Sequence, residues 1–119
     1  MARGSRHGDD PVIDGGPGSD TVNYNGTPAA VTVDLPAGKA SGGYGNDTLT
    51  SIENARGSSF DDLLFALVSG SALEGGSGND HLTGAVGDDH LDGGPNSPGA
   101  SDVCLGNGGN DVITNCEVT

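Results

Sequence analysis

The chain has 119 residues, enough for a single domain, with 23 glycines, no tryptophan and only 3% aromatic residues, so any core must be a thin layer of small aliphatic side chains. Seventeen acidic and four basic residues give a net charge of −13, which argues against nucleic acid and anionic lipid as partners. No apolar run of about 20 residues is present, so membrane insertion is not expected. Composition alone favours an acidic, glycine-rich linker, unless a multivalent cation supplies the missing cohesion.

The segment 1–14 does not match the repeating pattern that follows. It carries Arg3 and Arg6, but no apolar segment comes after these residues, as a signal peptide would require. We expect residues 1–14 to be a remnant of a tag or a truncated first repeat.

A nine-residue pattern, G-G-x-G-x-D-x-U-x with U a large aliphatic residue, begins at residue 15. It fits residues 15–23 (GGPGSDTVN), 42–50 (GGYGNDTLT) and 75–83 (GGSGNDHLT) without a mismatch. The first two of these copies start three repeats apart, and the last two start three repeats plus six positions apart. This fixed spacing favours an ordered repeat structure over a linker.

Weaker copies of the pattern fill the intervals. Residues 24–32 and 33–41 keep the frame without the glycines or the aspartate at position six, and the hexapeptide 51–56 (SIENAR) explains the six extra positions. Four copies run without a gap from 57 to 92, an insertion occupies 93–96, and two more copies cover 97–114. We therefore predict one repeat domain over 15–114, degenerate at 15–56 and more regular at 57–114, with a C-terminal cap at 115–119.

Each repeat is predicted to form a turn over positions one to six and a short strand over positions seven to nine. Side chains alternate along a strand, so the aliphatic residue at position eight points inward. Two repeats then make one coil, and stacked coils bury a continuous aliphatic column. The position-eight residues are Val22, Val31, Leu49, Leu64, Leu73, Leu82, Leu91, Cys104 and Ile113. Segment 31–35 (VTVDL) alternates like a half-buried strand, and Ile52 and Ala55 are expected to point inward from the hexapeptide.

The tandem pattern over residues 15–114 resembles the haemolysin-type calcium-binding repeats of the RTX (repeats-in-toxin) family. The resemblance implies an all-β fold, a right-handed parallel β-roll (a solenoid similar to a β-helix) of stacked 18-residue coils, with several calcium ions in the turns. Calcium takes six to eight oxygen ligands, so one turn supplies part of a site and the turn one coil later supplies the rest.

The resemblance assigns the ligands by position in the repeat. Position six gives the carboxylates of Asp20, Asp47, Asp62, Asp80, Asp89, Asp102 and Asp111. Glycines let the turn carbonyls point at an ion, and the remaining ligands are expected from the turn residues Ser58, Phe60, Gly75, Gly76, Ser77, Gly78, Gly84, Gly87, Gly106 and Gly108. Ser71 takes position six in one repeat and should weaken that site.

Alternate repeats share an edge of the predicted roll. Asp62, Asp80 and Asp102 fall on one edge, and Ser71, Asp89 and Asp111 on the other. The clearest pairs are Asp62–Asp80 and Asp89–Asp111, because the insertion disturbs the spacing between Asp80 and Asp102. No partner turn is recognisable for Asp20, which leaves a calcium ligand and a solvated turn aspartate as open alternatives.

Two further pairs of residues are candidate sites. His81 and His90 both occupy position seven, so they should point outward from opposite sheets and cannot share a zinc ion. Cys104 and Cys116 are expected to form a disulfide that ties down the last coil, with two free thiols as the alternative.

The sequence predicts a calcium-binding module that folds on calcium binding, within a larger secreted protein. A surface-recognition roll of the adhesin or ice-binding type is the alternative, but the outward threonines are interrupted by residues such as His81 and Leu105. Neither HExxH nor GxSxG occurs, so no enzyme activity is expected. The sequence does not define the oligomeric state.

Overall fold

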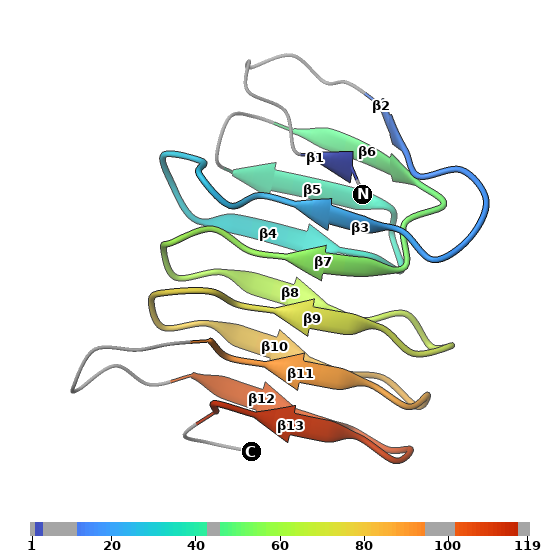
Figure 1. The fold of residues 1–119 in the computed structure, drawn as a ribbon, viewed down its shortest axis with the longest axis vertical. Helices are drawn as coiled ribbons and strands as arrows, with labels where there is room; N and C mark the ends of the chain where they lie inside the picture. The colour runs from blue at the N-terminus through green and yellow to red at the C-terminus, as the bar shows by residue number, and fades with distance from the viewer. Residues whose placement is uncertain (1, 4–11, 43–45, 95–101, 117–119) are drawn as a thin grey trace.

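A computed structural model describes residues 2–3, 12–42, 46–94 and 102–116. These residues form thirteen strands in two sheets (Figure 1). The described residues contain no helix, and therefore no helix that could cross a membrane. The strands are β1 (Ala2–Arg3), β2 (Val12–Asp14), β3 (Thr21–Asn23), β4 (Val31–Asp34), β5 (Lys39–Gly42), β6 (Asp47–Thr50), β7 (Asn54–Arg56), β8 (Leu63–Phe65), β9 (Ala72–Glu74), β10 (His81–Thr83), β11 (His90–Asp92), β12 (Val103–Leu105) and β13 (Val112–Thr114). The protein is therefore all-β in the described residues.

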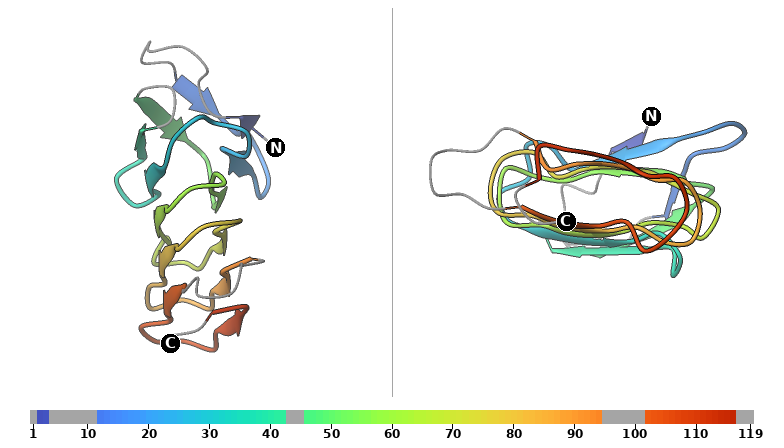
Figure 2. Two further views of the ribbon diagram at one scale, coloured as in Figure 1. Left: turned by 90° about the vertical axis from the view of Figure 1, so that its left-hand side faces the viewer. Right: turned by 90° about the horizontal axis from the view of Figure 1, so that it is seen from below.

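From β7 to β13 the chain passes alternately between the two sheets. Strands β7, β9, β11 and β13 are neighbours in a six-stranded sheet, and β8, β10 and β12 are neighbours in a seven-stranded sheet. All of these pairings are parallel. Seen from below, successive turns of the chain lie over one another (Figure 2). The strands are short because most positions of each repeat belong to a turn.

The register of these strands follows the predicted spacing of one coil. Leu73 pairs with Leu91, and Leu64 pairs with Leu82, in each case two repeats further along the chain. Leu82 pairs in turn with Cys104, across the insertion. Position-eight residues thus pair with position-eight residues from β8 to β13, as the sequence predicts.

The N-terminal part departs from the repeat in its strand direction. Strand β5 lies between β4 and β6 and is antiparallel to both. The prediction that residues 24–32 and 33–41 keep the repeat frame is wrong, because Val33 rather than Val31 pairs with Leu64. The physical cause is a tight reversal after β4. Gly38 has φ of 69° and donates to the carbonyl of Leu35 at 3.1 Å, which closes a hairpin instead of a repeat turn.

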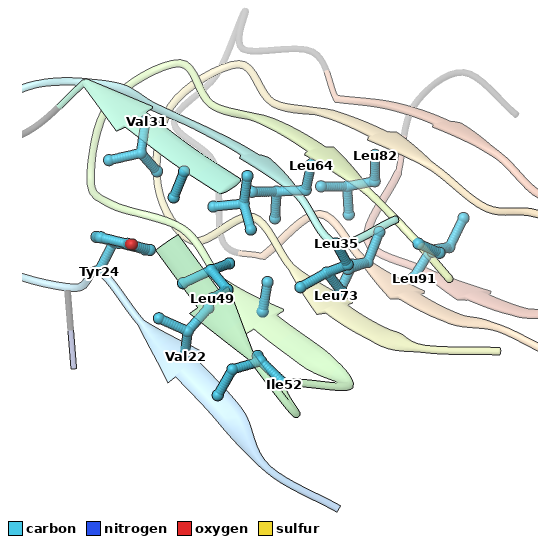
Figure 3. Packing of buried hydrophobic residues seen from close by; sticks show 14 of the residues in the cluster. Val22, Tyr24, Val31, Leu35, Leu49, Ile52, Leu64, Leu73, Leu82 and Leu91 are labelled. Carbon is cyan, nitrogen blue, oxygen red and sulfur yellow. The ribbon is translucent and has the colours of Figure 1, made fainter. Parts of the chain in front are cut away.

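The core is a narrow column of aliphatic side chains between the two sheets (Figure 3). The position-eight residues Val22, Leu64, Leu73, Leu82, Leu91 and Cys104 are fully buried. Ile52 and Ala55 are also buried, which confirms their inward orientation from the hexapeptide. Val31 and Leu49, which the sequence also predicts to point inward, are buried as well, and Ile113 is partly buried against the column.

The structure also relocates the insertion. The sequence places the insertion at residues 93–96, but Gly93 donates its N–H to the carbonyl of Thr114 at 3.0 Å, just as Gly75 donates to Asp92 at 2.8 Å. Gly93 therefore occupies position one of its repeat, and the extra residues fall between Gly94 and Asp102. Strands β1 and β2 pair with β3 and β6, so residues before 15 contribute to both sheets, and the domain boundary at 15 stays a prediction.

Candidate calcium-binding turns

On the first edge, formed by the turns that precede β8, β10 and β12, three aspartates form a ladder. The backbone N–H of Asp62 donates to Oδ1 of Asp80 at 2.8 Å, and the N–H of Asp80 donates to Oδ1 of Asp102 at 2.6 Å. All three residues are almost completely buried. The structure therefore brings together the three aspartates that the sequence assigns to this edge, including the Asp80–Asp102 pair across the insertion.

A second ladder runs along the opposite edge. Ser71 donates its N–H to Oδ1 of Asp89, and Asp89 donates to Oδ1 of Asp111, both at 2.8 Å. Asp89 is buried, while Asp111 is only partly buried. These contacts match the predicted pairing of Asp89 with Asp111.

A similar contact joins Asp20 to a residue that sequence reasoning missed. Asp20 donates its N–H to Oε1 of Glu53 at 2.8 Å, and its carbonyl accepts the N–H of Glu53 at 3.1 Å. Glu53 thus stands where an aspartate stands in the other turns. Its position two residues before Ala55, an inward residue, was the available signal. Asp20 therefore has a partner turn, in the hexapeptide 33 residues later.

The carboxylates of Asp62 and Asp89 also accept hydrogen bonds from their own turns. The N–H of Ser58 donates to Oδ2 of Asp62 at 2.7 Å, and that of Ala85 donates to Oδ2 of Asp89 at 2.8 Å. In the serine-containing repeat the N–H of Leu67 donates to Oγ of Ser71 at 3.0 Å. Serine keeps this contact within the turn but has no second oxygen for a neighbouring turn, which is the physical reason to expect a weaker site there.

The glycines at position one leave space that carboxylate and carbonyl oxygens line. A Cβ on Gly84 would lie 2.6 Å from Oδ2 of Asp89 and 2.6 Å from the carbonyl oxygen of Gly106. A Cβ on Gly57 would meet Oδ2 of Asp62 at 2.5 Å and the carbonyl oxygen of Gly75 at 2.8 Å. Oxygens from two stacked turns therefore meet at one place, and hard oxygens are the ligands that calcium prefers.

The other predicted turn residues stack on the neighbouring turn through their backbones. A Cβ on Gly76 would lie 2.7 Å from the carbonyl oxygen of Ser58, one on Gly78 would lie 2.7 Å from that of Phe60, and one on Gly87 would lie 2.7 Å from that of Val68. A Cβ on the position-one glycines Gly75 and Gly106 would collide with the carboxylates of Asp80 and Asp111, respectively. Ser77 and Gly108 are exposed, as is the side chain of Phe60.

The first ladder is electrostatically unfavourable without a cation. Burial, together with the neighbouring carboxylates of Asp62 and Asp102, raises the pKa of Asp80 to about 8. The hydrogen bond from the N–H of Asp62 acts in the opposite direction and lowers this pKa, but its effect is smaller than that of burial. Burial likewise raises the pKa of Asp62. Oδ2 of Asp80 is buried and accepts no hydrogen bond. A buried carboxylate oxygen without a donor fits a cation ligand.

Asp47 differs from the other predicted ligands. Its Oδ2 accepts a 2.7 Å hydrogen bond from the hydroxyl of Tyr24, and both residues are buried. Burial, followed by the hydrogen bond to Asp47, raises the pKa of Tyr24 above its usual range. The structure thus places Asp47 against a core tyrosine rather than in either ladder.

Within the described part of the chain, no group of three or more His, Cys, Asp or Glu side chains converges on one point. Ions in these turns would therefore rely on backbone carbonyls beside one or two carboxylates. His81 and His90 are exposed on strands of opposite sheets, as predicted. Sequence reasoning thus placed the two histidines correctly.

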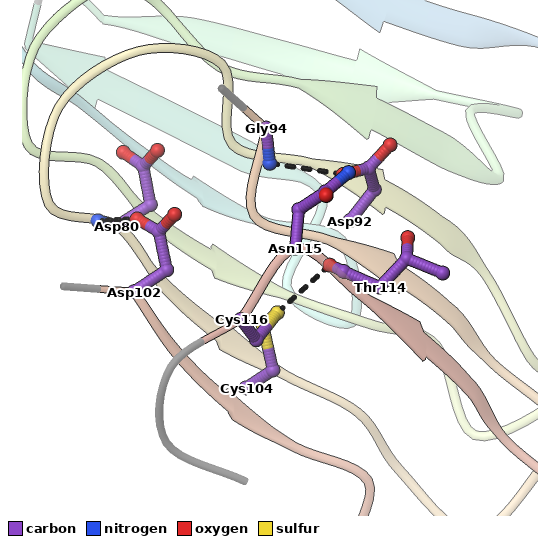
Figure 4. Close-up of a disulfide and its surroundings, with 8 residues drawn as sticks. All are labelled: Asp80, Asp92, Gly94, Asp102, Cys104, Thr114, Asn115 and Cys116. Atoms are coloured by element: carbon purple, nitrogen blue, oxygen red, sulfur yellow. Dashed lines mark hydrogen bonds between the residues drawn. A yellow bond between two sulfur atoms is a disulfide. The ribbon is translucent and has the colours of Figure 1, made fainter. Parts of the chain in front are cut away.

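Cys104 and Cys116 form a disulfide, with Cα atoms 6.0 Å apart, which confirms the predicted bridge (Figure 4). Cys104 is fully buried on β12, and Cys116 follows β13 and packs against the core. The bridge therefore links the last described strands of the two sheets. It lies two residues from Asp102, at one end of the first ladder.

These features define an all-β repeat domain with paired parallel strands and oxygen-lined turns. A family model described as the RTX calcium-binding nonapeptide repeat (4 copies) matches residues 72–97 and 99–114. Over these residues the chain is similar to RTX calcium-binding nonapeptide repeats, a structural repeat family that binds calcium. No curated protein matches the chain.

Proposed function

We propose that this protein is a calcium-binding β-roll module of a secreted protein, which folds when calcium binds and serves a structural role linked to secretion. The observation that supports the proposal most directly is the pair of carboxylate ladders, one along each edge of the stacked turns. Right-handed winding, a domain spanning 15–114 and the absence of catalysis belong to the same proposal.

The proposed ligands are the ladder carboxylates together with turn carbonyls. Asp80 and Asp89 each stand between two neighbours of their ladder, so they would serve two stacked turns. Bound calcium would supply two positive charges per ion, which offset the repulsion between buried carboxylates. The chain's own residues supply the oxygen cradle, and the position-one glycines keep that cradle open.

Charge supports a link with secretion. Residues 57–116 contain nine acidic and no basic residues, so the calcium-free repeats repel one another along the whole stack. Extracellular modules bind calcium with dissociation constants on the order of 10⁻⁴–10⁻³ M, so they remain empty at cytosolic calcium levels. RTX repeat proteins are typically secreted, and an open chain before export with a folded chain afterwards fits this charge pattern.

A calcium titration followed by far-UV circular dichroism tests the proposal. We expect β structure to grow as calcium rises through the millimolar range, and chelator to reverse the change. Magnesium at the same concentration is the matched control, since it demands a smaller octahedral shell and should induce less structure. A spectrum that stays the same between chelator and calcium would contradict calcium-dependent folding.

A further inference from the structure

The two parts of the chain differ in how much apolar core they hold. Of the sixteen buried apolar side chains in the described residues, ten lie between Ile13 and Ala55 and six lie between Leu64 and Cys104. We call residues 12–56 the N-terminal unit and residues 57–116 the repeat unit. The N-terminal unit is shorter yet buries more apolar side chains, so burial stabilises it more per residue.

The two units also differ in charge. The N-terminal unit carries five acidic and two basic residues, for a net charge of −3, whereas the repeat unit carries nine acidic and no basic residues, for −9. Four aspartates of the repeat unit are buried, but Asp47 is the one buried carboxylate among the described residues of the N-terminal unit. Asp47 accepts the Tyr24 hydroxyl within the same unit. Self-repulsion therefore opposes folding mainly in the repeat unit.

Part of the hydrogen bonding of the N-terminal unit is local, although β2 with β6 and β3 with β7 pair in parallel across distant segments of the unit. Strands β4, β5 and β6 form an antiparallel sheet, and Leu49 donates its N–H to the carbonyl of Gly38 at 2.8 Å. Antiparallel neighbours joined by short turns close with local contacts, so their entropy cost is small. The parallel strands of the repeat unit instead pair across a whole coil of the chain.

The N-terminal unit also contains a strand edge on which the first strand of the repeat unit pairs. Strand β4 pairs with β8, so Val33 lies beside Leu64. The N–H of Val31 donates to Oδ1 of Asp62 at 2.8 Å, in the role that the N–H of Asp62 plays toward Asp80. The first carboxylate of the first ladder is therefore anchored on the N-terminal unit.

We propose that the N-terminal unit stays folded when calcium is withdrawn, and that it templates the calcium-dependent stacking of the repeat unit. Calcium removal then melts residues 57–116 and leaves β2–β7 paired. The calcium-free state is a partly folded protein with a defined boundary near Arg56. This inference rests on the proposed calcium-dependent folding of the repeat unit, and it holds whether or not the repeat unit serves secretion.

Hydrogen exchange read by mass spectrometry on the full chain tests the boundary. In chelator, peptides from 12–56 should exchange more than about tenfold slower than an unstructured chain, while peptides from 57–116 exchange at the unstructured rate. With calcium, both should be protected. Loss of protection in both units in chelator, or retention in both, would overturn the proposal.

A pair of matched core variants gives a second test. Val33→Ala removes apolar volume from the N-terminal unit and Leu82→Ala from the repeat unit, and both side chains are fully buried. In chelator, Val33→Ala should shift the residual thermal transition to lower temperature, and Leu82→Ala should leave it unchanged. With calcium, both should shift the melting transition.

If Val33→Ala does not fold, Tyr24→Phe provides the milder version, because it removes only the hydrogen bond to Asp47. It should lower the same residual transition in chelator. A chelator transition that responds to Leu82→Ala, or one that ignores both Val33→Ala and Tyr24→Phe, would show that the residual structure is not the N-terminal unit.

Discussion

The backbone N–H of Asp62 donates to the carboxylate of Asp80, which lies 18 residues further along the chain and one turn further along the stack. This contact ties the position-six aspartate of one turn to the backbone of the turn before it. Because the same contact recurs from Asp80 to Asp102, the middle residue takes part in two turn-to-turn links. The effect of a substitution should therefore depend on its place in the ladder.

Asp80→Ala should remove a ligand from two ions, whereas Asp20→Ala should affect one at most. Asp80 stands between Asp62 and Asp102, but Asp20 has a turn-to-turn contact with Glu53 alone among the described acidic residues. Isothermal titration calorimetry of both variants should give the lower calcium stoichiometry for Asp80→Ala. Identical stoichiometry and affinity in the two variants would contradict the sharing of ions between stacked turns.

The calcium-free protein should gain structure as the pH falls from about 8 toward 5. Burial raises the folded-state pKa of Asp80 to about 8, far above the value of about 3.9 for an unfolded aspartate. Between these values the folded state holds a proton that the unfolded state has lost, so stability falls as pH rises. Circular dichroism of calcium-free protein against pH checks this direction.

Asp80→Asn is the matched control for this pH dependence. The amide oxygen can still accept the N–H of Asp62, but the side chain no longer titrates. The variant should therefore show a flatter pH profile than the parent protein. Loss of β structure on acidification of the parent would contradict the prediction.

Gly84→Ala should weaken calcium binding in the second ladder. Its Cβ would lie 2.6 Å from both Oδ2 of Asp89 and the carbonyl oxygen of Gly106, so one oxygen must move away. Gly26→Ala is the control, because its φ of 94° strains an alanine while nothing lies within 4 Å of the new Cβ. The control should lose about 1–2 kcal/mol of stability with unchanged calcium affinity. Equal calcium affinity in the two variants would argue against the oxygen cradle.

Removal of the disulfide should loosen the last coil and leave the Asp62–Asp80 turns nearly untouched. Closing the loop between Cys104 and Cys116 stabilises by roughly 3 kcal/mol on a chain-entropy estimate. Reduction or Cys116→Ser should increase hydrogen exchange in β12 and β13 and weaken the ion at Asp89–Asp111, with β8 and β10 as internal controls. Thiol titration of unreduced, calcium-loaded protein should detect no free thiol, and two titratable thiols would contradict the bridge.

The regular part of the fold could be predicted because every repeat contains the residues that define its turn and its strand. Glycines and Asp80 define a turn, and Leu82 two residues later defines the inward face of the next strand. The strand direction of β5 could not be predicted in this way. The alternation in VTVDL specifies a strand but not its neighbour, and the reversal at Gly38 depends on a turn outside the repeat.

The candidate site was predictable to the same extent. The pairings of Asp62 with Asp80 and of Asp89 with Asp111 follow from the repeat pattern alone. The hydrogen bond between Tyr24 and Asp47 joins two distant segments through the core, so no local pattern indicates it. Glu53 was missed because a glutamate replaces the aspartate within a shortened turn.

The pairing of Leu82 with Cys104 across the insertion has a consequence for protein engineering. The register between β10 and β12 is kept although this coil is longer than its neighbours, and all of the extra length falls between Gly94 and Asp102. Strands β11 and β13, which are separated by the same insertion and by β12, keep their pairing as well. Because the strand register is kept across this additional length, the segment between Gly94 and Asp102 is a natural place for grafting a foreign peptide.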